Sequence, residues 1–143
     1  MRTTSLVCLL LAMTGICFGQ AQQALCPKHI ETPVYPQIAR TAHVSGKVAV
    51  TLTIDGDGKV VTADVPYTNQ PIGLLARSTK DNIRRWTFVK PPFAPYTETV
   101  VYDYELDASL KDYETKVSYD LPDHVSILAG IATIQPSISK SKN

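Results

Sequence analysis

The stretch "KVAVTLTIDGDGKVVTADV", Lys47–Val65, decides the fold of this chain. Its first half alternates apolar side chains with polar or small ones in a period of two, which is typical of a half-buried β-strand. Lys59–Val65 is a second run rich in β-branched residues. The Asp-Gly-Asp-Gly sequence between them is a strong hairpin signal, because aspartate and glycine accept the backbone angles of a tight turn. We therefore predict two antiparallel strands joined at this turn.

The same turn also resembles the start of a calcium loop. An EF-hand loop needs oxygen ligands at its first, third and fifth positions, a glycine at the sixth and a glutamate at the twelfth. Asp55 and Asp57 fit the first two, but Lys59, Val60 and Pro66 stand at the other three. The lysine would repel the ion. We therefore interpret the turn as structural, and the sequence predicts no metal site and no cofactor.

The residues on either side of this hairpin predict two helices and more strands. Tyr35–Gly46 favours a short helix with Pro36 in its first turn and Ile38 and Ala39 as its apolar positions. Asn69–Trp86 carries apolar residues three or four apart, the period of an amphipathic helix packed on a sheet. Thr97–Leu106 alternates again and predicts a third long strand.

A C-terminal extension follows this third strand, at residues 108–134. Thr115–Leu121 alternates and predicts one further strand. His124–Ile134 is rich in Ile and Val, which favours another strand, although Ala129 and Gly130 leave a helix open. The last residues, 135–143, form a polar tail that we expect to be disordered.

The N-terminus has the layout of a secretory signal peptide. Arg2 precedes an apolar run, Leu6–Phe18, and the small residues Gly19 and Ala21 follow. The run is short for a membrane span, which needs about 20 apolar residues. We predict a signal peptide at residues 1–21, a short leader at 22–34 and export to the periplasm. An uncleaved signal that keeps the protein at the membrane stays open as the alternative.

The composition excludes several classes of function. The 143 residues are 44% hydrophobic and 19% charged, as in an ordinary globular domain. Loss of Arg2 with the signal would leave as many basic as acidic residues, 13 of each, so a nucleic-acid partner is not expected. We find no catalytic motif, and His29, His43 and His124 share no ligand spacing. The sequence predicts a protein that is not an enzyme.

One ordered set of features resembles the TonB C-terminal domain family. The features are Tyr35-Pro36 with Ala39 and Arg40, Gly46 before the alternating strand, the Asp-Gly-Asp-Gly-Lys turn, Gly73-Leu74-Leu75 at a helix start, and Trp86-x-Phe88 before prolines. The resemblance covers residues 33–107. It implies an α+β fold, with a three-stranded antiparallel sheet and two helices on one face at residues 35–107. The extension would add one or two strands.

The resemblance also implies a way of binding. Domains of this family hold a short segment of an outer-membrane transporter, which adds as a strand to the sheet edge. The corresponding edge here is the strand Thr97–Leu106, and the neighbourhood of Tyr35, Pro36 and Arg40 would make a side contact. The predicted partner-binding residues on the strand are Thr97, Thr99, Val101, Asp103 and Glu105. The expected partner is therefore a protein, and the expected process is TonB-dependent transport across the outer membrane.

The chain departs from this family in two ways that bear on function. The leader between Ala21 and Val34 spans about 40 Å at most, far less than the long proline-rich spacer of a transducer. In addition, Thr115–Leu121 follows the third strand closely enough to pair with it and cover the binding edge. Two alternatives stay open: a short transducer anchored by its signal, and a self-capped or homodimeric scaffold, in which Cys26 would link two copies.

Overall fold

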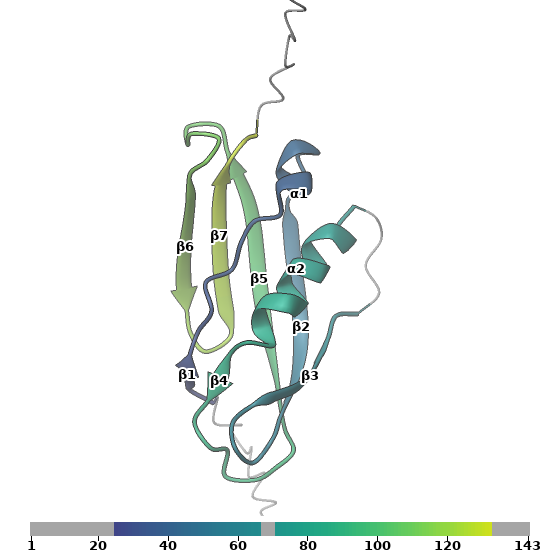
Figure 1. The fold of residues 1–143 in the computed structure, drawn as a ribbon, viewed down its shortest axis with the longest axis vertical. Coiled ribbons are helices and arrows are strands. Elements are labelled where there is room, and N and C mark those ends of the chain that lie inside the picture. The colour runs from purple at the N-terminus through teal and green to yellow at the C-terminus, as the bar shows by residue number, and fades with distance from the viewer. Residues whose placement is uncertain (1–24, 67–70, 133–143) are drawn as a thin grey trace, which may run out of the picture.

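A five-stranded mixed sheet carries both helices on one of its faces (Figure 1). The computed structural model describes residues 25–66 and 71–132. The predicted signal peptide, the start of the leader and the polar tail lie outside these residues. In chain order the described elements are β1 (Pro27–His29), α1 (Gln37–Thr41), β2 (Gly46–Ile54), β3 (Val60–Asp64), α2 (Gly73–Ile83), β4 (Thr87–Phe88), β5 (Tyr96–Asp107), β6 (Thr115–Asp120) and β7 (His124–Gly130).

The predicted hairpin is confirmed as the antiparallel pair β2–β3. In its turn, one carboxylate oxygen of Asp55 accepts hydrogen bonds from the backbone N–H groups of Asp57 and Lys59, both at 2.9 Å. These hydrogen bonds, that from Lys59 first, hold the pKa of the Asp55 carboxyl below its usual range. The aspartate that a calcium loop would use as its first ligand therefore closes the turn.

The three-stranded antiparallel sheet that the sequence predicts is present as β3-β2-β5. β2 and β5 pair from Gly46↔Tyr104 to Ile54↔Tyr96 without a break in register. Because side chains alternate between the faces of a strand, every second residue of both strands points toward the helices. These residues form the core, and they include Val48, Val50, Leu52, Ile54, Val100, Tyr102 and Tyr104.

Both predicted helices are present, and α2 buries the apolar stripe read from the sequence. Its buried residues are Leu75, Ala76, Thr79, Asn82 and Ile83. The short helix α1 begins at Gln37, after Pro36, and buries Ala39 as expected. Ile38, the other apolar position of this helix, is 62% exposed. A helix of five residues presents one narrow face to the sheet, and Ala39 and Arg40 occupy that face.

The C-terminal extension adds two strands, and its pairing corrects one prediction. The sequence led us to expect Thr115–Leu121 beside the third strand. Instead β7 lies beside β5, in parallel, from Val101↔His124 to Asp107↔Gly130. β6 lies outside β7 and pairs with it antiparallel, so the sheet order is β3-β2-β5-β7-β6. The edge of β5 is therefore covered from Val101 onward, but by a different segment.

The order of these two strands follows from their side chains. On the face toward the helices β7 carries Val125, Ile127 and Ala129, all fully buried. The cross-strand neighbours of these three residues in β6 are Tyr119, Val117 and Thr115, which stay exposed or half-exposed. Burial of apolar area stabilises by about 25 cal/mol per Å². The more apolar strand therefore takes the inner position, and the more polar one forms the edge.

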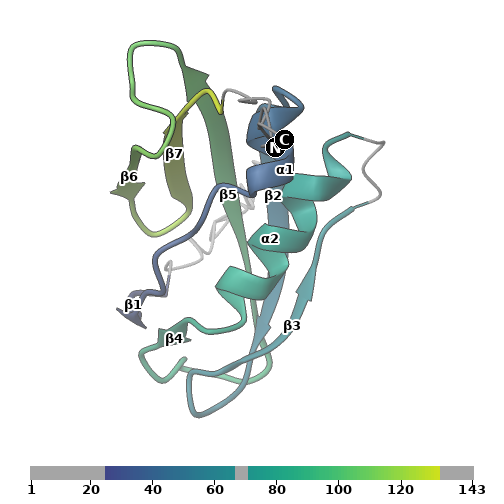
Figure 2. The ribbon, with the colours of Figure 1, turned by 45° about the horizontal axis from the view of Figure 1, so that its top comes forward.

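A segment of the predicted leader is also part of the fold. β1 pairs with β4 as a small second sheet, and Leu25, just before it, is 5% exposed. From β1 the chain crosses the helix side of the large sheet and reaches α1 (Figure 2). The indole N–H of Trp86 and the side-chain amide of Asn82 both donate to the carbonyl oxygen of Glu31, at 3.3 and 2.9 Å. These contacts hold the crossing segment against α2 and the core.

Candidate partner-binding surface

β7 covers three of the five predicted partner-binding residues of β5. Val101, Asp103 and Glu105 pair with β7, and Val101 and Asp103 pair with β2 as well, so they stand in the interior of the sheet. Thr97 and Thr99 pair with β2 and precede the first residue that pairs with β7. An incoming segment would meet the backbone of the later residues only after β7 had left its place.

The side chains of these same residues point to the face of the sheet opposite the helices. There the ammonium of Lys47 lies 2.8 Å from a carboxylate oxygen of Asp103, and this hydrogen bond raises the pKa of Lys47. The hydroxyls of Thr51 and Thr99 lie 3.3 Å apart. Both helices lie on the other face of the sheet (Figure 2).

Tyr35, just before α1, and Arg40, within α1, were expected at a side contact, but both are buried. The hydroxyl of Tyr35 donates to the carbonyl of Val44 at 2.5 Å, and its ring meets that of Tyr104 edge to face at 5.2 Å. Burial, first, and the neighbouring Tyr104 raise the pKa of Tyr35 to about 12. Pro36 is half-buried at the start of α1. Of Tyr35, Pro36 and Arg40, Pro36 alone is partly accessible to a partner while β7 is in place.

Arg40 contacts the end of β7 directly. Its Nε donates to the carbonyl oxygen of Gly130 at 3.0 Å, and the residue is 7% exposed. Its Nη2 is buried and has no hydrogen-bond partner among the described residues. Gly130 also donates its own N–H to the carbonyl of Glu114 at 3.0 Å. A side chain at position 130 would collide with the carbonyl oxygen of Lys111, so a glycine is required where β7 ends.

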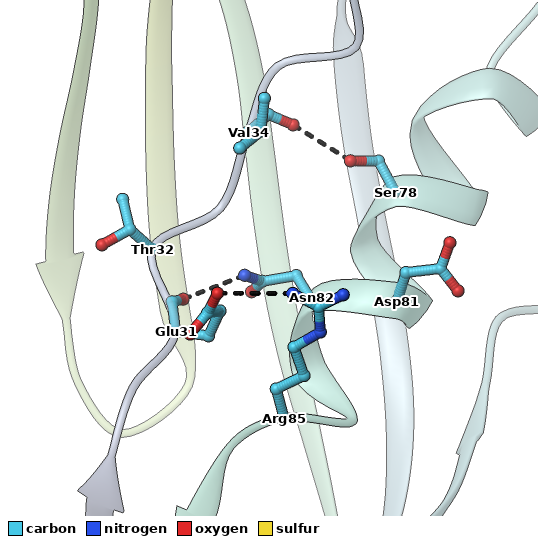
Figure 3. A pocket seen from close by; sticks show the side chains of 7 residues that line it. All are labelled: Glu31, Thr32, Val34, Ser78, Asp81, Asn82 and Arg85. Atoms are coloured by element: carbon cyan, nitrogen blue, oxygen red, sulfur yellow. Dashed lines mark hydrogen bonds and ion pairs between the residues drawn. The ribbon is translucent and has the colours of Figure 1, made fainter.

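Sequence reasoning missed a buried amide that joins three parts of the fold. The side-chain oxygen of Asn82 accepts from the hydroxyl of Tyr102 at 2.8 Å and from the indole N–H of Trp86 at 3.1 Å. Its nitrogen donates to Glu31 (Figure 3). The signal in the sequence was an asparagine on the mostly apolar side of α2. Its partners in β5 and in the crossing segment are distant along the chain.

Two hollows lie along α2 on the helix side. The first, of about 150 Å³, lies between α2 and the crossing segment, where Ser78 donates to the carbonyl of Val34 at 3.0 Å and Arg85 lies 3.4 Å from Glu31 (Figure 3). The second, of about 470 Å³, lies between the helices and includes Ile38 and Leu74. Both are open and shallow, so they suit contact with a protein surface better than capture of a small molecule.

The described residues contain no cluster of metal-ligating side chains. Nowhere in residues 25–66 and 71–132 do three histidine, cysteine, aspartate or glutamate side chains lie close enough to hold a metal ion. Cys26 is exposed and forms no disulfide within these residues. No helix in the described part of the chain is long and apolar enough to cross a membrane.

Comparison with known proteins identifies the family. The model of the Gram-negative bacterial TonB protein C-terminal family matches residues 31–106, more than half of the chain. Among solved structures, the chain is similar to the Pseudomonas aeruginosa TonB C-terminal domain determined in solution by NMR. The two share 22% identity over 59% of this chain and 89% of that one, with a TM-score of 0.45. No curated protein matches the chain. β6 and β7 both lie beyond the family match, which ends at Leu106. The chain belongs to the TonB C-terminal domain family.

Proposed function

We propose that this protein binds an extended segment of an envelope protein as a strand on β5, in the place that β7 occupies. The family consists of non-enzymatic interaction modules of the cell envelope. The proposed partner is an outer-membrane transporter, and the proposed process is TonB-dependent transport. The binding residues would be Val101, Asp103 and Glu105, which β7 covers, and Thr97 and Thr99, which precede them on β5 and would contact a segment longer than β7.

The parallel pairing of β5 with β7 is the observation that carries this proposal. The backbone N–H and C=O groups on a strand edge can form hydrogen bonds with any extended segment whose side chains fit. β7 is such a segment, supplied by the chain itself, and its seven residues pair with Val101–Asp107. In this proposal the extension is a displaceable cap, and the protein binds its partner by exchanging one strand for another.

The side chains of β7 specify what a partner segment must offer. Val125, Ile127 and Ala129 fill the core beside Tyr102 and Tyr104, whereas His124, Ser126 and Leu128 point to the outer face. Burial of a valine or isoleucine side chain stabilises a fold by about 1.5–3 kcal/mol. A competing segment therefore needs small or β-branched apolar residues at three alternate positions, because a more polar one would leave the core uncovered.

Arg40 connects this exchange to the predicted side contact of Tyr35, Pro36 and Arg40. Its hydrogen bond to Gly130 ends when β7 leaves, and its Nη2 already lacks a partner within the described residues. A buried guanidinium without acceptors is costly. A carbonyl or carboxylate of the incoming segment would satisfy both nitrogens. We propose that Arg40 holds the end of whichever strand lies on β5.

A disulfide that locks β7 onto β5 tests the proposal. Glu105 and Leu128 face each other in the β5–β7 register, so Glu105→Cys with Leu128→Cys, in a Cys26→Ser background, would fix the cap. Thr53→Cys with Thr62→Cys is the matched control, because it joins β2 to β3, which stay together and include none of the proposed binding residues. Binding is measured by co-sedimentation with outer-membrane vesicles of Gram-negative cells, prepared by shearing so that the periplasmic face is accessible, before and after reduction.

The expected result is that the oxidised lock abolishes co-sedimentation and that reduction restores it. The oxidised control should bind as the unmodified chain does. If the locked and control proteins bind the vesicles equally well, the partner does not use the β5 edge. If neither variant nor the unmodified chain binds vesicles, an outer-membrane partner is excluded.

A further inference from the structure

The outer edge of β6 is one of the two edges of the five-stranded sheet. β6 stands at one end of the strand order and pairs only with β7 among the described strands. Figures 1 and 2 both place it at the margin of the molecule, with no described element beyond it. Its register with β7 runs from Thr115 to Asp120 without a bulge, and it contains no proline. Such an edge pairs readily with another strand.

The two faces of β6 carry different side chains. Val117 and Tyr119 point to the helix side, opposite Ile127 and Val125 of β7, and Tyr119 remains 37% exposed. Lys116, Ser118 and Asp120 point to the outer face, opposite residues 128, 126 and 124 of β7. The strand therefore presents an apolar row on one face and one charge of each sign on the other.

We infer that β6 pairs antiparallel with β6 of a second copy of this chain, about a two-fold axis at Ser118. Residues equally distant from the axis then face each other. Lys116 of each copy then lies opposite Asp120 of the other copy, and Val117 lies opposite Tyr119 of the other copy. The two Ser118 residues lie opposite each other. Directly opposed side chains of opposite charge, and aromatic with β-branched side chains, are the pairs that stabilise antiparallel sheets. The edge is therefore complementary to itself.

The neighbouring registers lack this complementarity. Directly opposed residues must share a face, so the axis has to pass through a residue and not between two. An axis at Val117 would place Glu114 opposite Asp120, two like charges. An axis at Tyr119 would place Asp120 opposite Ser118 and Lys116 opposite Pro122, so neither charge would face a charge of opposite sign. Ser118 is the centre that pairs charge with countercharge and apolar with apolar.

The opposite edge of the sheet does not offer the same match. β3 contains a single charged residue, Asp64, and its pairing with β2 is interrupted by a bulge next to Val60. Centred on Thr62, a β3 pair would place Asp64 opposite Val60. The dimer we infer therefore uses β6 and joins two five-stranded sheets into one, with all helices on the same face. It does not rest on the proposed function, since this edge is exposed while β7 is in place.

A charge swap tests the pairing. The full chain, purified as the cell processes it, is studied by sedimentation velocity over a range of concentrations, with Lys116→Asp, Asp120→Lys and the double variant. Each single reversal sets two like-charge pairs in the dimer and should raise the dimer dissociation constant about tenfold or more. The double variant restores both pairs and should return the constant to the unmodified value.

Two results would overturn the inference. One is an unmodified chain that stays monomeric up to about 1 mM, where even a weak dimer would be detected. The other is a double variant that dimerises no better than the single ones. Because both side chains are exposed, the variants should keep their fold, and circular dichroism and thermal melting serve as the check.

Cross-linking locates the interface independently. In a Cys26→Ser background, Ser118→Cys places two thiols on the two-fold axis, with Cβ atoms about 5 Å apart. Mild oxidation should then give a covalent dimer. Thr62→Cys, on the same face but in β3, is the matched control and should stay monomeric. Equal cross-linking at both positions, or cross-linking of the control alone, would contradict a dimer through β6.

Discussion

The guanidinium of Arg40 donates a hydrogen bond at 3.0 Å to the carbonyl oxygen of Gly130, 90 residues later in the chain. It joins the short helix α1 to the last residue of β7. We predict that Arg40→Ala lowers the free energy of unfolding by about 1.5–3 kcal/mol, because Gly130 loses a charged donor and packing is lost around it.

Hydrogen exchange checks this prediction. The amides of β7 should exchange faster in Arg40→Ala, whereas those of β2 should change little. Arg77→Ala, an exposed arginine of α2, is the control and should leave both rates unchanged. Unchanged β7 exchange in Arg40→Ala would mean that this hydrogen bond does not hold the strand.

The hairpin turn gives a prediction with an internal control. Gly58 has a φ of +84°, and a Cβ atom there would lie 2.2 Å from the carbonyl oxygen of Phe88. Gly58→Ala should destabilise the fold by well over about 1 kcal/mol, since both the backbone and the contact are incompatible with a side chain. At Gly56 the nearest atom to such a Cβ is 3.7 Å away. Gly56→Ala should be nearly neutral in urea denaturation, and a similar loss for both would refute the argument.

Asn82 should be among the polar residues most sensitive to substitution. Asn82→Leu removes the acceptor of the Tyr102 hydroxyl and one of the two acceptors of the Trp86 indole, which keeps its hydrogen bond to Glu31. A buried unsatisfied group costs about 1–3 kcal/mol, so we expect a loss of that size in unfolding free energy. Trp86 fluorescence reports the unfolding. Arg84→Ala, exposed beside it, should cost less than about 0.5 kcal/mol, and equal losses would contradict a special role of the amide.

The carboxyl of Glu98 should make the stability of the fold depend on pH. Burial raises its pKa; a hydrogen bond from the N–H of Leu25 opposes this in part, and Asp123 adds to the rise. A raised pKa means that ionisation of this carboxyl lowers the stability of the fold. The loss is absent at pH values below the ordinary pKa of glutamate and complete above the pKa that Glu98 has in the folded protein. Glu98→Gln should therefore stabilise the fold at pH 7, by less than about 1 kcal/mol, and lose this gain near pH 4.

Thermal melting at the two pH values measures this difference. Glu105→Gln, on the same strand but exposed, is the control and should show no such dependence. A Glu98→Gln protein that is less stable than the unmodified chain at pH 7 would show that the hydrogen bond to Leu25 outweighs the burial.

The sequence predicts the elements of this fold better than it predicts the neighbours of its last two strands. Periodicity located β2, β3, α2 and β5, because it reflects which face of each element is buried. It could not rank β6 and β7 as partners of β5, since both alternate. The decisive signal was present but unused: β7 has Val125, Ile127 and Ala129 on one face, whereas β6 offers Thr115, Val117 and Tyr119.

The candidate site was predictable only in part, for a related reason. The resemblance to the family indicated β5 and the segment around Tyr35, but residues 108–132 lie outside the family pattern and decide which edge is accessible. The burial of Arg40 depends on Gly130, and no local pattern relates two residues so far apart. Contacts of this range follow from the assembled sheet and not from any single stretch.

Hydrogen exchange with and without outer-membrane vesicles tests the exchange of strands on β5 most directly. If the partner takes the place of β7, the amides of β6 and β7 should lose protection when vesicles bind, while those of Val101–Asp107 keep theirs, because a new strand covers the same edge. Gained or unchanged protection of β7 in the bound state would contradict the account, since it would mean that the partner binds with the cap in place.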